Sequence, residues 1–208
     1  MASGERLNMA YVKEAFNPIT LEDAMHVVLT SDPENPSKFV DETNKLIHVI
    51  LDAGIITSDS VVLDFGCGMG RISKELVDRV GCTVHGLDQS QVMLDHAITY
   101  VNSDKFKPCT EFPDNKIDVA ISILVLQHTE DPIKEISSIY DSLTDGGYFI
   151  LVNESYRLIP VDINDDGWVI WSDDGINIYA EVANKFTEVA RSNKAGGLDV
   201  ILFMKDSQ

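Results

Sequence analysis

The residues best suited to chemistry begin at an acid that is followed by three glycines at alternate positions. They are Asp64, Gly66, Gly68 and Gly70. Glycines let the backbone pass close to a ligand, and the free N–H groups at the start of a following helix can face that ligand. A second acid, Asp88, follows, and its carboxylate can accept hydrogen bonds from both hydroxyls of a ribose. The pattern indicates a site for a cofactor that contains a nucleoside.

Two classes of nucleoside cofactor share this pattern, and the spacing of the glycines separates them. The dinucleotide fingerprint GxGxxG requires its third glycine at position 71, where this chain has Arg71. The chain also has no recognisable Tyr-x-x-x-Lys pair of the kind that short dehydrogenases carry. The sequence therefore argues against NAD and FAD.

Strands and helices must alternate around these residues if the two acids are to meet. Val61–Leu63 predicts a strand that ends at the first acid, and apolar residues then recur at helical spacing. Cys82–Leu87 predicts a second strand, and Ser90 can cap a helix that runs to about Val101. Ile117–Val125 is apolar on both faces, as expected of a central strand. This alternation is typical of a parallel sheet with crossover helices.

The flanking segments predict further helices and a closing hairpin. Met9–Leu29 suggests two short helices that are parted by Asn17 and Pro18. The next helix is expected over Ser37–Asp52, with a buried face made of Val40, Ile47, Val49, Ile50 and Leu51. Antiparallel strands are expected over Phe186–Arg191 and Leu198–Met204.

Between residues 39 and 152 the motifs, taken in order, resemble class I S-adenosylmethionine-dependent methyltransferases. The glycine turn and Gly86-Leu87-Asp88 look like the cofactor motifs of that family, and three later segments match in sequence order. These segments are Phe112–Asp118, Leu126–His128 with Asp131-Pro132, and Leu143–Gly147. The resemblance implies an α/β three-layer sandwich whose mostly parallel seven-stranded sheet has an antiparallel last strand.

The resemblance also implies roles in binding S-adenosylmethionine. Asp64 would orient the ammonium group, Gly66 and Gly68 would pack against the methionine portion, and Asp88 would hold the ribose. The expected cofactor set is Asp64, Gly66, Cys67, Gly68, Asp88, Gln89, Cys109, Thr110 and Tyr11. Cys67 is expected to be a packed thiol of the loop rather than a nucleophile.

Two parts of that cofactor set stay open. The acid that relatives carry after the third strand, near the adenine, has no clear equivalent here. Asp104, Glu111 or backbone groups near Cys109 and Thr110 are alternatives for this contact. Tyr11 either belongs to a lid over the cofactor or lies on an amphipathic helix that simply packs on the domain.

His128 is the candidate base on the acceptor side. It follows the central strand, and ligands in open α/β sheets bind outside the carboxyl ends of the strands. Methyl transfer needs alignment above all, and it needs a base only where the acceptor arrives protonated. The alternative is that His128 only packs or hydrogen-bonds within its loop. The Asn/Asp-Pro-Pro motif of nucleobase methylation is absent after this strand, which favours a small-molecule acceptor.

Charge narrows the choice of partner. The chain of 208 residues has 34 acidic and 16 basic side chains, a formal net charge of −18. Such a charge repels nucleic acid and anionic membranes and favours a cationic or neutral acceptor, an amine for example. The first residues lack the apolar core of a signal peptide, and no apolar run is long enough to span a bilayer. With three cysteines and no CxxC pair, the expected setting is the cytoplasm.

The carboxyl-terminal third is rich in acids and contains both tryptophans. Trp168 and Trp171 lie among carboxylates, and they either hold a cationic acceptor or turn into the core beside a solvated loop. The residues from Asp162 to Asp173 also partly match a calcium loop, although an Asp at its closing position and Pro160 before it favour a turn. We therefore expect no metal site.

We expect one methyltransferase domain over residues 1–208. Residues 1–58 would form amino-terminal helices and a lid, 59–152 the cofactor-binding core, and 153–208 the acceptor-side segment and terminal hairpin. The expected function is S-adenosylmethionine-dependent methyl transfer to a small-molecule acceptor. The alternative is a regulatory protein that binds the cofactor without catalysis. Neither function predicts whether the protein is a monomer or an oligomer.

Overall fold

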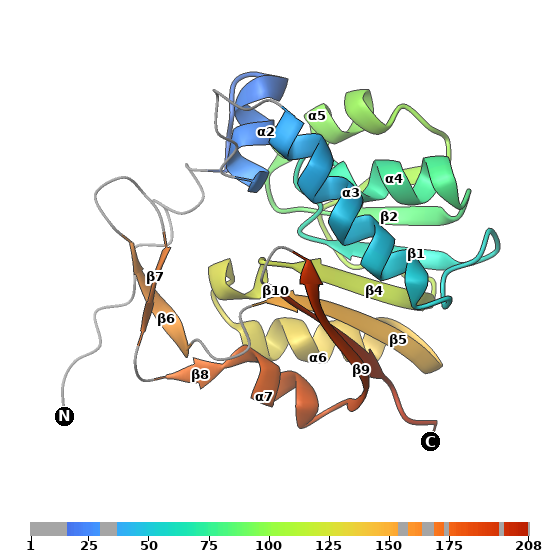
Figure 1. Cartoon of the computed structure of the whole chain (residues 1–208), viewed down its shortest axis with the longest axis vertical. Coiled ribbons are helices and arrows are strands. Elements are labelled where there is room, and N and C mark those ends of the chain that lie inside the picture. Colours follow the sequence, from blue (N-terminus) through green and yellow to red (C-terminus); the bar gives the residue numbers. More distant parts are fainter. Residues whose placement is uncertain are drawn as a thin grey trace.

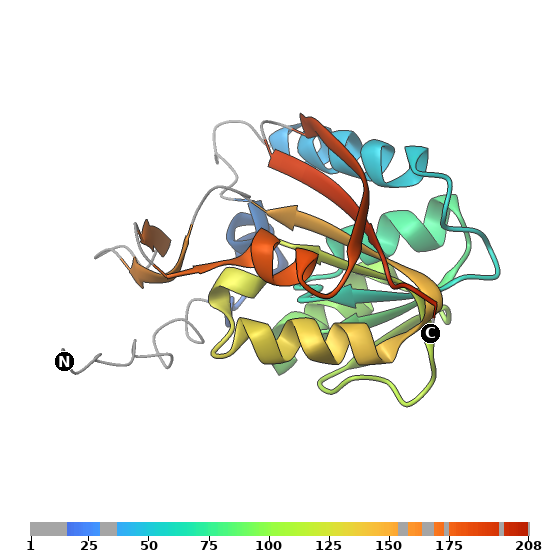
Figure 2. The same ribbon diagram turned by 90° about the horizontal axis from the view of Figure 1, so that it is seen from below.

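The computed structural model describes residues 16–29, 37–153, 158–163, 169–172, 175–195 and 198–207. Its centre is a seven-stranded sheet with helices on both faces, as Figures 1 and 2 show. The strand order is β3-β2-β1-β4-β5-β10-β9. The predicted three-layer α/β fold is thereby confirmed.

Five neighbouring strands of this sheet are paired in parallel. They are β1 (Val61–Phe65), β2 (Thr83–Leu87), β3 (Phe106–Cys109), β4 (Ile117–Ile123) and β5 (Leu143–Asn153). β10 (Leu198–Met204) is antiparallel to both of its neighbours, β5 and β9 (Thr187–Ala195). The last strand in the chain is therefore the antiparallel one, as predicted, and it is inserted between β5 and β9 rather than placed at the edge.

The helices divide between the two faces of the sheet. On one face lie α3 (Ser37–Asp52), α4 (Arg71–Arg79) and α5 (Gln91–Val101), and α2 (Leu21–Leu29) packs beside α5. The opposite face is covered by α6 (Pro132–Ser142) and α7 (Ile178–Ala183). Each face has its own apolar core, and both cores reach the central strands β1, β4 and β5.

Local side-chain chemistry explains where several helices begin. Ser90 accepts a hydrogen bond from the backbone N–H of Met93 and so caps α5 at the predicted position. Asp131 caps α6 in the same way, and Pro132 occupies the first helical position, where a missing N–H costs nothing.

The bounds predicted for α3 are confirmed, but part of its predicted buried face is wrong. Val40 is 55% exposed, whereas Phe39 and Leu46 are buried. The buried residues of this helix recur at Phe39, Thr43, Leu46, Ile47 and Ile50. This spacing follows one helical face, and Val40 lies outside it.

A second, small sheet was not expected from the sequence. It consists of β6 (Leu158–Ile163), β7 (Val169–Ser172) and β8 (Ile176–Asn177), paired antiparallel in the order β7-β6-β8. It is inserted between β5 and α7 and projects from the main body in Figure 1. Asp162 lies in β6, while most of the considered calcium positions, and Trp168, lie outside the described residues.

Candidate cofactor and acceptor site

The glycine turn joins β1 to α4 at the carboxyl edge of the sheet. Gly66, Gly68 and Gly70 all have left-handed backbone angles, with φ of 73°, 53° and 81°. A Cβ added at Gly66 would approach the Val125 side chain to 2.4 Å, and one at Gly68 would approach Val28 to 2.9 Å. The turn therefore requires glycine both for its angles and for the close approach of its neighbours.

Asp88 ties this turn to the end of β2. One carboxylate oxygen accepts from the backbone N–H of Gly68 and the other from that of Ser90, each at 2.9 Å. Burial raises the pKa of the Asp88 carboxyl, and these two hydrogen bonds oppose that shift. Each oxygen keeps a further lone pair, so the carboxylate can still accept from ribose hydroxyls.

Asp64 lies buried near the carboxyl end of β1, with 4% of its surface exposed. Ser73 Oγ in α4 donates to its carboxylate at 2.7 Å. Burial raises the pKa of Asp64 to about 6, although Ser73 and the nearby Arg71 guanidinium favour the ionised form. Arg71 is itself buried, and its guanidinium donates to Thr43 Oγ1 at 3.4 Å. The site thus contains a buried carboxyl group whose ionised form is only partly stabilised by its neighbours.

The other predicted cofactor residues differ in their surroundings. Cys67 is buried and its thiol pKa is raised well above the usual value by that burial, which fits a packed rather than a nucleophilic thiol. The backbone carbonyl of Cys109 accepts from Asp88 N at 3.1 Å, so β3 reaches the same loop. Gln89 and Thr110 are exposed at this edge. Tyr11 lies outside the described residues.

The end of β4 forms the other half of the site. Leu124 has a φ of 55°, a conformation that is unusual for a large side chain, and it turns the chain into the short helix η1 (Leu126–His128). The ring of His128 lies edge-on to Phe16, with centroids 5.2 Å apart. Burial lowers the pKa of His128 to about 4, so its imidazole is neutral at physiological pH.

The segment from Phe16 to Leu29 contacts both halves of the site. Phe16 packs on His128, and Asn17 Oδ1 accepts from Ser90 Oγ at 2.7 Å, beside Asp88. Val28 lies over Gly68. These contacts are what a cover over the site would make, and the predicted lid in residues 1–58 remains a prediction.

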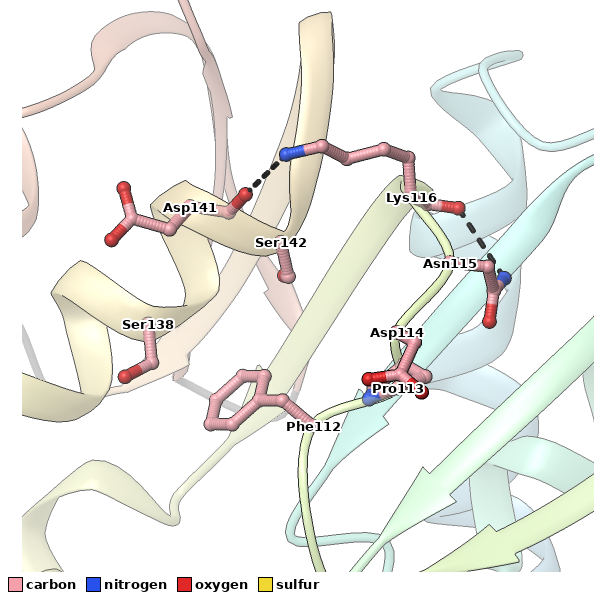
Figure 3. A pocket seen from close by; sticks show the side chains of 8 residues that line it. All are labelled: Phe112, Pro113, Asp114, Asn115, Lys116, Ser138, Asp141 and Ser142. Carbon is pink, nitrogen blue, oxygen red and sulfur yellow. Dashed lines mark hydrogen bonds between the residues drawn. The ribbon is translucent and has the colours of Figure 1, made fainter.

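One surface cavity lies at the opposite end of the sheet from the site, and a second cavity lies beside the site. One of about 300 Å³ is lined by the loop before β4 and the carboxyl half of α6, where Lys116 Nζ donates to the Asp141 carbonyl at 2.7 Å (Figure 3). It opens at the amino ends of β4 and β5, opposite the edge where such sheets bind ligands. Another, of about 250 Å³, is lined by Gln89 and by acids at the start of α6. Within the described ranges, no group of three or more His, Cys, Asp or Glu side chains is arranged to hold a metal ion.

A comparison with protein families shows which family has this arrangement of strands, helices and motifs. Residues 38–198 match the model of a methyltransferase domain, which covers most of the chain. The chain belongs to the methyltransferase-domain family. The chain resembles the class I S-adenosylmethionine-dependent group of that family, as its motifs predicted, and the dinucleotide alternative is set aside.

Curated relatives of this chain share its core over part of their length. Over 114 residues it is 29% identical to phosphoethanolamine N-methyltransferase 2 of Caenorhabditis elegans, covering 50% of this chain and 26% of the relative. Over 139 residues it is 31% identical to sterol 24-C-methyltransferase of Eremothecium gossypii, covering 56% and 37%. A ubiquinone biosynthesis O-methyltransferase of Shewanella is 32% identical over 107 residues, covering 46% and 45%. The matched stretches span less than half of these relatives.

Solved structures show the same fold at low sequence identity. Magnesium protoporphyrin IX methyltransferase from Synechocystis, solved with bound S-adenosylmethionine, superposes with a TM-score of 0.66 at 16% identity, covering 99% of this chain and 100% of that one. The cyclase SpnF superposes with a TM-score of 0.64 at 16% identity, covering 78% and 80%. No helix among the described residues is long and apolar enough to cross a membrane.

Several residues of the candidate site cannot be predicted from the sequence. Ser73, Val28 and Val125 enter the site from neighbouring elements, and a single sequence carries no signal for such contacts. In the sequence, Arg71 indicates only that the dinucleotide spacing is broken. Its burial next to Asp64 gives it a structural place in the turn.

Proposed function

We propose that this protein transfers the methyl group of S-adenosylmethionine to a small-molecule acceptor. The observation that carries the proposal is the joining of Asp64, the glycine turn and Asp88 at one edge of the sheet. In the reaction, the acceptor's lone pair forms a bond to the methyl carbon while the carbon–sulfur bond breaks, and S-adenosylhomocysteine is released. The protein's part is to align the two reactants and to exclude water.

The proposed cofactor contacts follow from the chemistry of the residues. Asp64 is a carboxylate in a buried place and would attract an ammonium group. Asp88 would accept from ribose hydroxyls while still holding Gly68 and Ser90. The backbone near Cys109 and Thr110 would reach the adenine, because Cys109 adjoins the Asp88 loop.

The acceptor is the less constrained half of the proposal. The names of the curated relatives include N-, C- and O-methyltransferases, so they leave the attacking atom open. The net charge of −18 supports a neutral or cationic acceptor, with an amine as the candidate, over nucleic acid or an anionic membrane surface. His128 is the proposed base, because its imidazole is neutral at pH 7 and one ring nitrogen has a lone pair that can accept a hydrogen bond or a proton.

The low pKa of His128 limits what it can do for an amine. An imidazole with a pKa of about 4 takes a proton from an alkylammonium only steeply uphill. We therefore propose that an amine acceptor enters already neutral and that His128 orients it by a hydrogen bond. The new substituted ammonium keeps its proton and loses it to water after release, because the same low pKa makes transfer to His128 unfavourable.

A second candidate function is cofactor binding without methyl transfer. The side chains of Val125 and Val28 lie against Gly66 and Gly68, where a cofactor would pass. The resemblance to the fold of SpnF, named a cyclase, shows that this architecture occurs in proteins with another activity in their name. A cytoplasmic setting is proposed for either function, since Cys67, Cys82 and Cys109 are all free thiols.

Calorimetry with S-adenosylmethionine, S-adenosylhomocysteine and NAD, followed by a methyl-transfer screen, tests both functions. We expect the first two ligands to bind and NAD not to bind. Asp88→Ala should weaken binding of S-adenosylmethionine by about 1.5 to 3 kcal/mol, the range for a hydrogen bond to a charged group. The matched control is Asp95→Ala, because Asp95 is an exposed acid in α5, the helix that follows Asp88. Tight cofactor binding without turnover of any amine, phenol, thiol or carboxylate acceptor would favour the binding protein.

A further inference from the structure

Four buried polar side-chain atoms have no hydrogen-bond partner among the described residues. They are Ser122 Oγ, Gln127 Oε1, His128 Nδ1 and Asn153 Oδ1, and we name these four residues the edge cluster. Ser122 is fully buried, and Gln127 and Asn153 are 8% and 3% exposed. Buried polar groups in folded proteins are nearly always paired, because an unpaired one costs stability. Four such atoms therefore need a common explanation.

The topology places the edge cluster at one end of the main sheet. Ser122 lies near the carboxyl end of β4, Asn153 is the last residue of β5, and Gln127 and His128 are in η1, which follows β4. None of the four comes from the amino-terminal edge of the sheet or from α2 to α7. They lie where open α/β sheets bind their ligands.

The register brings Ser122 and Asn153 to the same face of two adjacent strands. Ser122 is aligned with Leu151 of β5, and Asn153 is two residues further along that strand. Because side chains alternate between faces, Ser122, Leu151 and Asn153 point to one side. Strand spacing and rise put the Cα atoms of Ser122 and Asn153 about 8 Å apart. One small polar group can reach both side chains.

The backbone between these elements supports a functional explanation. Leu124 has a left-handed φ of 55°, which is costly for a branched, bulky residue and typical of functional sites. Its N–H bonds to the Val152 carbonyl at 2.9 Å, so the strained residue holds β4 against the end of β5. This arrangement directs η1 toward the ends of the two strands.

The free atoms have a shared chemistry. Gln127 Oε1 and Asn153 Oδ1 are hydrogen-bond acceptors, Ser122 Oγ can accept or donate, and a neutral imidazole offers one accepting nitrogen. None of the four side chains is cationic at neutral pH. A group that donates hydrogen bonds would satisfy them, whereas a carboxylate or phosphate would meet lone pairs.

We propose that Ser122 and Asn153, assisted by Gln127, bind a hydrogen-bond-donating group of the methyl acceptor, either a hydroxyl or an amine N–H. The inference rests on the proposed methyl transfer and names the acceptor's class. Ser122 and Asn153 act as specificity residues. Since Phe16 packs on His128 in this structure, the segment from Phe16 to Leu29 has to move aside for the acceptor to enter.

Thermal denaturation of Ser122→Ala and Asn153→Leu provides a first test that needs no knowledge of the acceptor. If the polar atoms are unpaired in the free protein, apolar replacements of similar size should leave the melting temperature unchanged or raise it. Ser142→Ala is the matched control, because Ser142 Oγ donates to the Ile139 carbonyl at 2.8 Å and its loss should not stabilise. A clear fall in melting temperature for both Ser122→Ala and Asn153→Leu would show that structural partners, such as buried water, satisfy these atoms, and it would overturn the proposal.

Ligand-observed NMR on protein saturated with S-adenosylhomocysteine gives the second test. The probes are paired: phenol with anisole, aniline with N,N-dimethylaniline, and small alcohols with their methyl ethers. We expect the donor member of at least one pair to bind wild type and Ser142→Ala, and to bind Asn153→Leu about tenfold more weakly or worse. Three outcomes would each reject the assignment. They are equal binding of the two members of every probe pair, equal binding of a donor probe to wild type and to Asn153→Leu, and no binding of any probe.

Calorimetry of the cofactor separates this inference from the proposed function. Ser122→Ala and Asn153→Leu should bind S-adenosylhomocysteine as wild type does, because Asp64 and Asp88 are untouched. If wild type binds no cofactor, the proposed function fails, while the melting temperatures still report on the edge cluster. If cofactor binding is intact and donor recognition is absent, only the edge-cluster assignment fails.

Discussion

At the scale of single residues, burial sets the chemistry of this site. Asp64 and His128 are both shifted toward their neutral forms, with pKa values of about 6 and about 4. The same cause moves the acid up and the base down, because a low-dielectric surrounding disfavours charge of either sign. Each shift predicts a pH dependence that a simple titration can test.

Binding of S-adenosylmethionine should release protons near pH 6. A cationic ammonium beside Asp64 lowers the pKa of that carboxyl from about 6, so up to about one proton leaves on binding. Affinity should therefore rise as pH increases through 6. Calorimetry in buffers of different ionisation enthalpy measures the release, and Asp64→Asn should abolish it. Binding at pH 6 without proton release in wild type would refute the contact with Asp64.

His128 should make the fold sensitive to acid. Its pKa is about 4 when folded and near 6.5 when unfolded, so the unfolded chain binds the proton first as pH falls from 6.5 to 4. Stability is lost across that window, by at most about 3 kcal/mol. Urea denaturation of wild type and His128→Gln at pH 7 and pH 5 tests this, and the variant should lose less stability. An equal loss in both proteins would mean that His128 titrates normally.

At the scale of elements, the junction between β1 and α4 depends on the end of β4. Gly66 combines a left-handed φ of 73° with close contact to Val125. The turn and the β4 end therefore constrain each other, although they are far apart in sequence.

Gly66→Ala should destabilise the protein by about 1 to 3 kcal/mol. The new methyl group meets Val125, and alanine pays for the left-handed angle. In a double-mutant cycle, Val125→Ala should relieve the steric part and leave the backbone part. Gly54→Ala is the control, since its φ is also positive at 68° and its added Cβ has no neighbour within 4 Å. Equal losses at the two glycines would show that backbone angle alone matters.

At the scale of the whole molecule, net charge acts on whatever approaches the site. A formal charge of −18 on 208 residues produces a negative potential over much of the surface. Salt shortens the reach of that potential to a Debye length of about 8 to 10 Å. The main sheet determines where the site lies, whereas this negative potential acts on a charged ligand before the ligand reaches the site.

Once an acceptor is identified, its kinetics should report the field. For a cationic acceptor, kcat/KM should fall several-fold between about 20 and 300 mM salt, and for an anionic acceptor it should rise. Steady-state assays at fixed pH, with a neutral acceptor as the control, measure this. A preference for anionic acceptors at low salt would contradict the expected acceptor class.

The positions of Asp64 and Asp88 in the fold could be predicted from sequence because the signals around them are local. Strand periodicity, the glycine turn and a capped helix lie within short stretches around Asp64 and Asp88, so local rules suffice to place both acids at the ends of adjacent strands. The bounds of α3 were equally local, being set by the apolar period between residues 37 and 52.

Only the tertiary structure decided which side chains meet. The hydrogen bond from Ser73 to Asp64, the contact of Val125 with Gly66 and the shared face of Ser122 and Asn153 all join separate elements. Val40 was misassigned because a helical period does not say which of two overlapping faces meets the sheet. Sequence by itself determined the fold class and the placement of Asp64 and Asp88 at the ends of adjacent strands. Packing across elements determined their pKa values and the unpaired polar atoms, because desolvation and hydrogen-bond satisfaction depend on neighbours that only the folded chain brings together.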